Sequence, residues 1–304
     1  MTLTPRVAAL LVVPPVMWAC NALVGRLLAD SMPPLLLNAL RWWTALLVLL
    51  PLGWGALSTP ERRAQVRQRW RPLAVLGLLG VGAYNALQYQ ALQTSTPINV
   101  TLIASSTPLW MLLIGALFHG ERVRGAQAVG AVLSMLGVLI VLVRGNLAGL
   151  SDIRLVPGDL WMLLAALSWA VYSWLLARPH PTLSGEQRPA WTWAEFLLVQ
   201  AVFGIGWATL AAAGEGALSA HRMEPTAGTL AALAFVALGP SILAYRCWGL
   251  GVAAVGPAVA GFFGNLTPLF AALASALWLG QPPQPYHALA FAFIVAGIVE
   301  SNRR

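Results

Sequence analysis

The residues of this sequence best suited to holding a small molecule are aromatic side chains with a polar tip, set within long apolar runs. A tryptophan or tyrosine ring offers a large apolar surface, and its N–H or O–H seeks a hydrogen bond when the ring is buried. Such a set fits a ligand with an apolar part and a polar part, although packing alone could use the same residues. The candidates, with one asparagine neighbour, are Trp18, Asn21, Tyr84, Tyr89, Trp110, Trp169, Tyr172 and Tyr245.

Two arginines also fall within apolar runs, where a charge is costly. They are Arg41 and Arg246. The planar guanidinium of either could bind a carboxylate, or it could reach toward water along its aliphatic stem and bond loose carbonyls. We favour the structural role for Arg41. Both roles stay open for Arg246, which joins the candidate binding residues.

Two prolines interrupt runs that otherwise predict helices, in the segments STPLWMLLIGALFHG and LTPLFAALASALWLG. Proline inside a helix removes a backbone hydrogen bond, so Pro108 and Pro268 release the carbonyls of Ala104 and Gly264. In hydrocarbon such breaks survive only where protein or water meets the carbonyl. We therefore predict that both prolines are hinges beside a cavity, with plain kinking as the alternative.

The elements that must position these residues are membrane-spanning helices. The chain has 304 residues, of which 59% are apolar and 9% charged, whereas a soluble domain carries about 25% charged residues. A spanning helix needs roughly 20 apolar residues. The expected spans are residues 6–28, 33–54, 72–93, 97–118, 125–143, 159–177, 192–214, 228–249, 255–279 and 284–300.

Tryptophans toward the ends of these runs are expected to form an aromatic belt at the membrane–water interfaces. They are Trp42, Trp43, Trp54, Trp70, Trp161, Trp191, Trp193 and Trp278. Cys20 and Cys247 are expected to be small packing residues rather than a disulfide or a metal pair.

The arginines are distributed unevenly between the two sides of this predicted topology. The net charge is +8, but the basic residues fall in short loops rather than on one face, which argues against nucleic-acid binding. With the N-terminus inside, the cytoplasmic side receives most arginines, as the positive-inside rule requires. The outer side receives Arg26, Arg144, Arg154 and Arg222. Both termini are therefore predicted to be cytoplasmic.

The chain contains an internal repeat. A shift of 160 residues aligns Pro97 with Pro257, Thr107-Pro108-Leu109 with Thr267-Pro268-Leu269, Gly120 with Gly280 and Gly137 with Gly297, and a shift of 151 aligns Trp18-Ala19 with Trp169-Ala170. The predicted units are residues 1–145 and 159–304, joined by a glycine-rich linker at 146–158. Because each unit holds an odd number of spans, the second enters the membrane upside down. Inverted repeats of this kind place a substrate site near the midplane, where the units meet.

The sequence resembles the drug/metabolite transporter superfamily, and within it the ten-helix EamA-type exporters. The resemblance covers nearly the whole chain and is carried by Trp18, Asn21, Arg41, SSTPLWMLLIGALFHGERV, GAQAVGAVLSMLGVLIV, LTPLFAALASALWLGQP and AFIVAGIV. A Gly-Glu pair often follows both proline helices in the family; Gly120-Glu121 keeps it, and Gly280-Gln281 does not. The resemblance implies an all-α integral membrane protein, with ten transmembrane helices as a 5+5 inverted repeat around a central cavity.

The same resemblance implies export of small metabolites across a bacterial inner membrane by alternating access, and aromatic-rich members export aromatic and other neutral amino acids. No Asp or Glu lies in the middle of a span, and the four histidines lie in loops or at helix ends. Because proton relays need a buried titrating group, we predict transport without obligatory proton coupling. We expect a monomer with no cofactor and no metal, whose partners are the substrate and the lipid bilayer.

Three other functions fit the sequence less well. The alternative is a multidrug or organic-cation exporter of the same superfamily. This alternative is less favoured, because no buried acid would neutralise a cation. A channel would build its filter from carbonyls or rings of charge, whereas two kinked halves suit rocking around a site. A membrane enzyme is disfavoured, because the histidines are scattered and no HExxH or GxSxG pattern occurs.

Overall fold

The computed structural model of the chain describes residues 3–28, 31–95, 97–143, 145–146, 156–218, 223–279 and 284–303. Every regular element within these residues is helical. Up to residue 142 the elements are α1 (Pro5–Leu27), α2 (Pro34–Gly53), η1 (Trp54–Leu57), α3 (Pro60–Gln68), α4 (Trp70–Leu76), η2 (Gly77–Ala83), α5 (Tyr84–Ala91), α6 (Pro97–Ser105), α7 (Thr107–His119) and α8 (Gly125–Leu142). The later elements are α9 (Pro157–Ala177), η4 (Pro181–Leu183), η5 (Gly185–Gln187), α10 (Trp193–Leu218), α11 (Ala227–Val236), η6 (Ala237–Leu243), α12 (Ala244–Val255), α13 (Pro257–Gly264), α14 (Thr267–Leu279) and α15 (Pro285–Ser301). The predicted linker falls largely outside the described residues.

Seven described stretches are long and apolar enough to cross a bilayer, which makes the chain an all-α membrane protein. They are Pro5–Gly25, Pro34–Leu57, Val100–His119, Pro157–Ala177, Trp193–Leu218, Ala227–Val255 and Pro257–Ala274. Two further apolar helices, α8 and α15, have 18 and 17 residues. The elements α4, η2 and α5 follow one another without a gap from Trp70 to Ala91.

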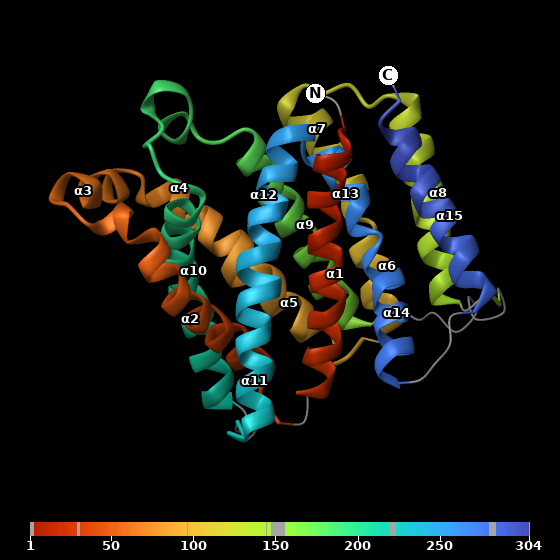
Figure 1. Ribbon diagram of the computed structural model, residues 1–304, viewed down its shortest axis with the longest axis horizontal. Coiled ribbons are helices and arrows are strands. Elements are labelled where there is room, and N and C mark those ends of the chain that lie inside the picture. Colours follow the sequence, from red (N-terminus) through yellow and green to blue (C-terminus); the bar gives the residue numbers. More distant parts are fainter. Residues whose placement is uncertain are drawn as a thin grey trace.

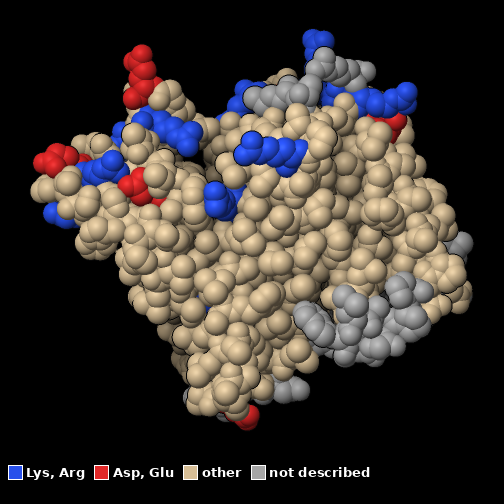
Figure 2. All heavy atoms as spheres, in the orientation of Figure 1, with Lys and Arg blue, Asp and Glu red and all other residues tan. Residues whose placement is uncertain are grey.

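The first and last helices bring the two ends of the chain to one edge of the molecule (Figure 1). We call this edge, which holds the start of α1 and the end of α15, the terminal face. Arginines gather along the terminal face and around α3, and the broad band below it is almost free of charge in this view (Figure 2). An uncharged band between polar edges is typical of a protein surrounded by lipid. Of the four arginines predicted for the outer side, none has a described side chain.

Helices that the predicted sequence repeat aligns have similar packing partners. Helix α1 packs against α12 and α14, while α9 packs against α5 and α7. Helices α8 and α15 lie side by side. Their crossing is close because a Cβ built on Gly130 would lie 2.6 Å from the carbonyl oxygen of Gly297, so a side chain there would force the helices apart.

Two helices contain a π-helical segment, in which the backbone bonds skip one residue more than in an α-helix. The segments are η2 and η6, and their first residues, Gly77 and Ala237, are 160 positions apart. Side chains meet carbonyls that η2 exposes: the Ser168 hydroxyl donates to the oxygen of Leu79 at 2.9 Å, and the Asn38 amide donates to that of Val81 at 3.3 Å.

The boundary between α12 and α13 differs from the prediction. Helix α12 continues to Val255, beyond the expected end at residue 249. It stops where Gly256 adopts a φ of +83°, a left-handed conformation that residues with a Cβ rarely adopt. The residues between the two predicted spans carry no charge, so the sequence does not indicate where one helix ends and the next begins.

Candidate functional site

An aromatic cluster occupies the centre of the fold. The ring of Trp169, on α9, lies 5.1 to 5.4 Å between centroids from five other rings, and its own exposed fraction is 4%. Those rings come from α1, α5, α9 and α12 and belong to Trp18, Tyr84, Tyr172, Tyr245 and Trp248. The structure therefore brings together five of the predicted binding residues. Trp248 is an addition that the sequence analysis did not select.

The cluster continues to α2 through Trp42, whose ring meets that of Tyr245 edge-on at 5.0 Å. Trp42 is fully buried, so its assignment to an interfacial belt was wrong. Its neighbour Trp43 is 47% exposed, as the belt prediction requires. The side chain of Trp278 lies outside the described residues.

Three polar tips of the cluster bond within the protein, whereas the buried Nε1 of Trp42 has no hydrogen-bond partner. Tyr172 donates to the Gln200 side chain at 3.1 Å, and Trp248 donates through Nε1 to the Ser173 hydroxyl at 3.1 Å. The Tyr245 hydroxyl donates to the Gly80 carbonyl of η2. The cluster thus joins an apolar interior to a few oriented polar groups, which is the composition of a small-molecule site.

A polar network centred on Arg41 lies beside the cluster. The Arg41 side chain is fully buried. Its Nε donates to the Ser241 hydroxyl at 2.5 Å, and its Nη1 lies 2.9 Å from the Asn85 amide oxygen. Nη1 also lies 3.5 Å from the predicted site residues Asn21 and Tyr89. The network therefore ties α2 to α1, α5 and η6.

Two of the predicted binding residues lie apart from this arrangement. Trp110 is half-buried and donates through Nε1 to the Ser106 hydroxyl at 3.0 Å, and among the described residues it contacts no aromatic ring of the cluster. Arg246 is exposed, with its guanidinium 4.6 Å from the ring centroid of Trp193. A binding role for either residue stays a prediction.

The predicted hinges lie at real breaks in the helices. Residue Ser106 separates α6 from α7, and the Thr107 hydroxyl donates at 2.6 Å to the Ala104 carbonyl that Pro108 deprives of its helical partner. This side chain meets the carbonyl, so the break does not by itself require a water-filled cavity. In the other part, Asn265 and Leu266 separate α13 from α14.

The two broken helices touch each other. A Cβ built on Gly261 of α13 would lie 2.7 Å from Sδ of Met111 and 3.4 Å from Cα of Pro108, both on α7. The two broken helices are thus packed directly against each other, and a hinge role for Pro108 and Pro268 stays a prediction.

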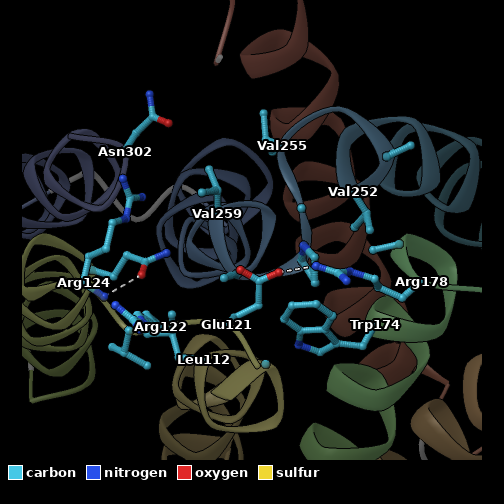
Figure 3. A pocket seen from close by; sticks show the side chains of 18 residues that line it. Leu112, Glu121, Arg122, Arg124, Trp174, Arg178, Val252, Val255, Val259 and Asn302 are labelled. Carbon is cyan, nitrogen blue, oxygen red and sulfur yellow. Dashed lines mark hydrogen bonds and ion pairs between the residues drawn. The ribbon is translucent and has the colours of Figure 1, made fainter. Parts of the chain in front are cut away.

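A cavity of about 750 Å³ lies at the terminal face, between the ends of α7, α9 and α12 and the starts of α8 and α13. Glu121 and Arg178 face each other across it as an ion pair, with the Trp174 ring beside them (Figure 3). Arg122 and Arg124 also line it, so positive side chains outnumber Glu121. None of the predicted binding residues lines this cavity.

Gly120 and His119 position the residues on the side of the cavity where Glu121 and Trp174 lie. Gly120 ends α7 with a φ of +65°, which turns the chain and places Glu121 toward Arg178. His119 stacks on Trp174 with centroids 4.4 Å apart, and Trp174 donates to the Met111 carbonyl at 2.7 Å. The sequence pointed to this region only through the Gly120-Glu121 pair. Nothing in the sequence marked His119 and Trp174 as its neighbours.

Comparison with known proteins gives consistent results. Residues 6–143 and residues 156–302 each match the model of the EamA-like transporter family. The chain is 29% identical over 272 residues to the aromatic amino acid exporter YddG of Ancylobacter novellus, covering 88% of this chain and 87% of that one. It is 28% identical over 249 residues to the probable terminal-alkyne amino-acid exporter of Streptantibioticus cattleyicolor, covering 78% and 76%. A protein crystal structure with 24% identity has the same fold, with a TM-score of 0.76 over 97% of this chain and 96% of that one.

Proposed function

This chain belongs to the EamA-like transporter family, and we propose that it exports aromatic and other neutral amino acids by alternating access. The observation that carries the proposal is the aromatic cluster around Trp169. Its rings come from both stretches that match the family model, with Trp18 and Tyr84 in the first and Trp169, Tyr245 and Trp248 in the second. A site built from both stretches is able to change when they move relative to each other.

The proposed architecture has ten spans in two inverted five-helix units, residues 1–145 and 159–304. The double match to the family model and the recurrent packing of α1 and α9 support it. The count of ten adds α8, α15 and the continuous stretch from Trp70 to Ala91 to the seven long spans. In a bacterial inner membrane, the arginine-rich terminal face would be cytoplasmic.

In this orientation the cavity at the terminal face would receive substrate from the cytoplasm. The aromatic cluster lies deeper, and its rings are in mutual contact, so the central cavity of the proposed cycle would form when they separate. Substrate would pass from the cavity to the cluster, and the broken helices α6–α7 and α13–α14 would bend as the path opens on the other side.

Transport would proceed without obligatory proton coupling. Among the described acidic residues, Glu195 and Asp159 lie in the first turns of their helices, and Glu215 lies in the last turn of α10. None sits at mid-membrane depth, where a proton relay would need it. The same distribution disfavours an organic cation as the main substrate.

Purified protein in liposomes tests the proposal. We expect saturable movement of labelled L-phenylalanine, inhibited by excess unlabelled neutral amino acids and unaffected when the pH gradient is collapsed. Inhibition by phenylalanine, threonine, methionine and tetraphenylphosphonium would rank the substrate classes. Flux that never saturates and occurs in single-channel steps would favour a channel, and loss of transport with the pH gradient would contradict the uncoupled mechanism.

A further inference from the structure

The side chains of α2 leave two buried donors and one buried acceptor without partners. Within the described part of the chain, the Arg41 Nη2 and Trp42 Nε1 donors and the Asn38 Oδ1 acceptor have no hydrogen-bond partner, and outside α2 the same holds for Trp191 Nε1. The three residues of α2 are fully buried. An orphaned buried polar atom is unfavourable, so each one requires a physical explanation, such as a functional role.

The charge of Arg41 is also unbalanced. The described ion pairs join Arg62 to Glu195, Arg178 to Glu121 and Arg303 to Glu300, so Arg41 is in none of them. Its known partners are neutral oxygens of Asn85, Ser241, Asn21 and Tyr89. A buried cation is strongly stabilised by an anion, and the planar guanidinium favours a carboxylate.

The orphaned atoms of Arg41 and Asn38 are suited to one ligand. Residues three apart in a helix lie on the same face, with about 5–6 Å between their Cβ atoms. Arg41 offers a donor with a positive charge, and Asn38 offers an acceptor. An α-amino acid presents the complementary pair on one carbon, a carboxylate and an ammonium group.

We propose that Arg41 and Asn38 form the head-group site of the transporter, in which Arg41 binds the carboxylate and Asn38 accepts a hydrogen bond from the ammonium group of a zwitterionic amino acid. This proposal rests on the proposed function and names the chemistry that its substrate must carry. The aromatic cluster is adjacent, since Trp42 follows Arg41 in α2 and contacts Tyr245 at 5.0 Å. The substrate side chain would therefore pack on the rings while its head group binds α2.

The location of the site fits the release step. Arg41 is closer to Pro34 than to Gly53, so it lies in the half of α2 that is away from the terminal face. The cavity lies at the opposite end of the path, and Arg41 is inaccessible in this state. The site therefore opens only after the rings of the cluster separate.

The experiment compares four probes in liposomes that contain wild-type protein, Asn38→Ala, Arg41→Gln or Arg41→Lys. The probes compete with labelled L-phenylalanine: unlabelled L-phenylalanine, phenylalaninamide, which lacks the carboxylate, 3-phenylpropionate, which lacks the ammonium group, and phenethylamine. The wild type should bind phenylalanine about tenfold or more tightly than each analogue, because a bond to a charged group is at stake. Arg71→Gln is the matched control, since it removes the charge of an exposed arginine that stacks on Trp70.

The variants should differ in which preference they lose. Arg41→Gln should bind phenylalanine no better than phenylalaninamide, and Arg41→Lys should keep only part of that preference. Asn38→Ala should keep the carboxylate preference but lose the preference over 3-phenylpropionate. Arg71→Gln should behave as the wild type. Equal inhibition of the wild type by phenylalanine and its amide would overturn the proposal while leaving amino-acid export intact.

A binding measurement keeps the proposal testable apart from transport. The melting temperature of the detergent-purified proteins is recorded with and without each probe. Stabilisation of the wild type by phenylalanine that is reduced in Arg41→Lys and Asn38→Ala supports the head-group site, even if no neutral amino acid is transported and the proposed function fails. Stabilisation that is the same in both variants as in the wild type would overturn the site, and so would its absence from the wild type. If Arg41→Gln does not fold, these two variants decide the matter.

Discussion

Trp18 and Trp169 meet edge to face at the centre of the protein, with their ring centroids 5.2 Å apart. The sequence repeat aligns these two residues with each other, so each is the counterpart of the other in the predicted units. Counterparts related by a two-fold axis touch only if they lie close to that axis. The contact thus supports a two-fold axis that passes through the aromatic cluster. The two units of the proposed transporter would move relative to each other at this place during the cycle.

Replacing Trp169 should impair transport more than replacing another tryptophan of the same helix. Trp169→Phe keeps an apolar ring in the cluster, so we expect a folded protein with a raised KM for phenylalanine. Trp161→Ala is the matched control, since Trp161 is also on α9 but is 41% exposed. Transport kinetics in liposomes give the comparison. Equal kinetic parameters for Trp169→Phe and wild type would assign Trp169 to packing alone.

Two glycines of α10 should respond differently to the same substitution. A Cβ at Gly204 would lie 2.3 Å from Cβ of Val81 in η2, whereas Gly206 has no atom within 4 Å of its added Cβ. We expect Gly204→Ala to lower the melting temperature and reduce the yield of folded protein, because α10 and η2 must separate. Gly206→Ala should leave the melting temperature unchanged or raise it, since alanine favours the helix. A neutral Gly204→Ala would show that this contact is looser than the structure has it.

Pro108→Ala tests the hinge between α6 and α7. Alanine restores the N–H that can bond to the Ala104 carbonyl, so the helix should straighten and stiffen. We expect an unchanged or higher melting temperature but a turnover roughly severalfold lower, because bending costs more free energy. Pro51→Ala is the control, since Pro51 is exposed within α2, away from the break. Turnover in liposomes is the readout, and equal turnover in both variants would argue against a hinge.

Two ion pairs should differ in what they contribute to stability. Glu195 has a side chain that is 8% exposed, pairs with Arg62 at 2.8 Å and accepts a bond from the Thr192 amide at 2.7 Å. Glu121 and Arg178 are 49% and 55% exposed. We expect Glu195→Gln to lower the melting temperature clearly, and Glu121→Gln to change the stability by less than about 1 kcal/mol. Thermal unfolding in detergent tests both, and the reverse order would contradict this ranking.

The proposed inverted topology predicts which residues are accessible from outside the cell. In a chain with Cys20 and Cys247 replaced by alanine, we introduce Leu150→Cys in the linker or Arg304→Cys at the C-terminus. An impermeant maleimide should label position 150 on intact cells, and position 304 only after the membrane is permeabilised. Labelling of both positions, or of neither, on intact cells would place the two predicted units in the same orientation.

The breaks in the helices could be predicted because they depend on residue types that leave a mark in the sequence. Pro108 and Pro268 lie immediately after the breaks that the structure contains. The π-helical segments left no common mark: η6 contains Pro240, but η2 is built from glycine, leucine, valine and alanine. Carbonyls of η2 accept hydrogen bonds from Ser168, Asn38 and Tyr245, which lie far away in the sequence.

The site could be predicted only in part, because a helix that is apolar on all sides does not reveal which face is buried. Trp42 and Trp43 are neighbours, yet the first is fully buried and the second is 47% exposed. In the same way Tyr245 enters the cluster while Arg246 faces outward over Trp193. The sequence favoured a structural role for Arg41, and its partners from three other elements become visible only in the folded chain.

The paired π-helical segments have a mechanical consequence. A residue in an α-helix occupies about 100° of rotation, so an inserted residue that migrates by one position along the helix turns everything beyond it by a comparable angle. The part of such a helix on one side of the π-helical segment can rotate about the helix axis relative to the part on the other side, while nearly all backbone hydrogen bonds stay formed. One such segment lies in each stretch that matches the family model, with first residues 160 positions apart, so we expect the same rotation to be possible in both.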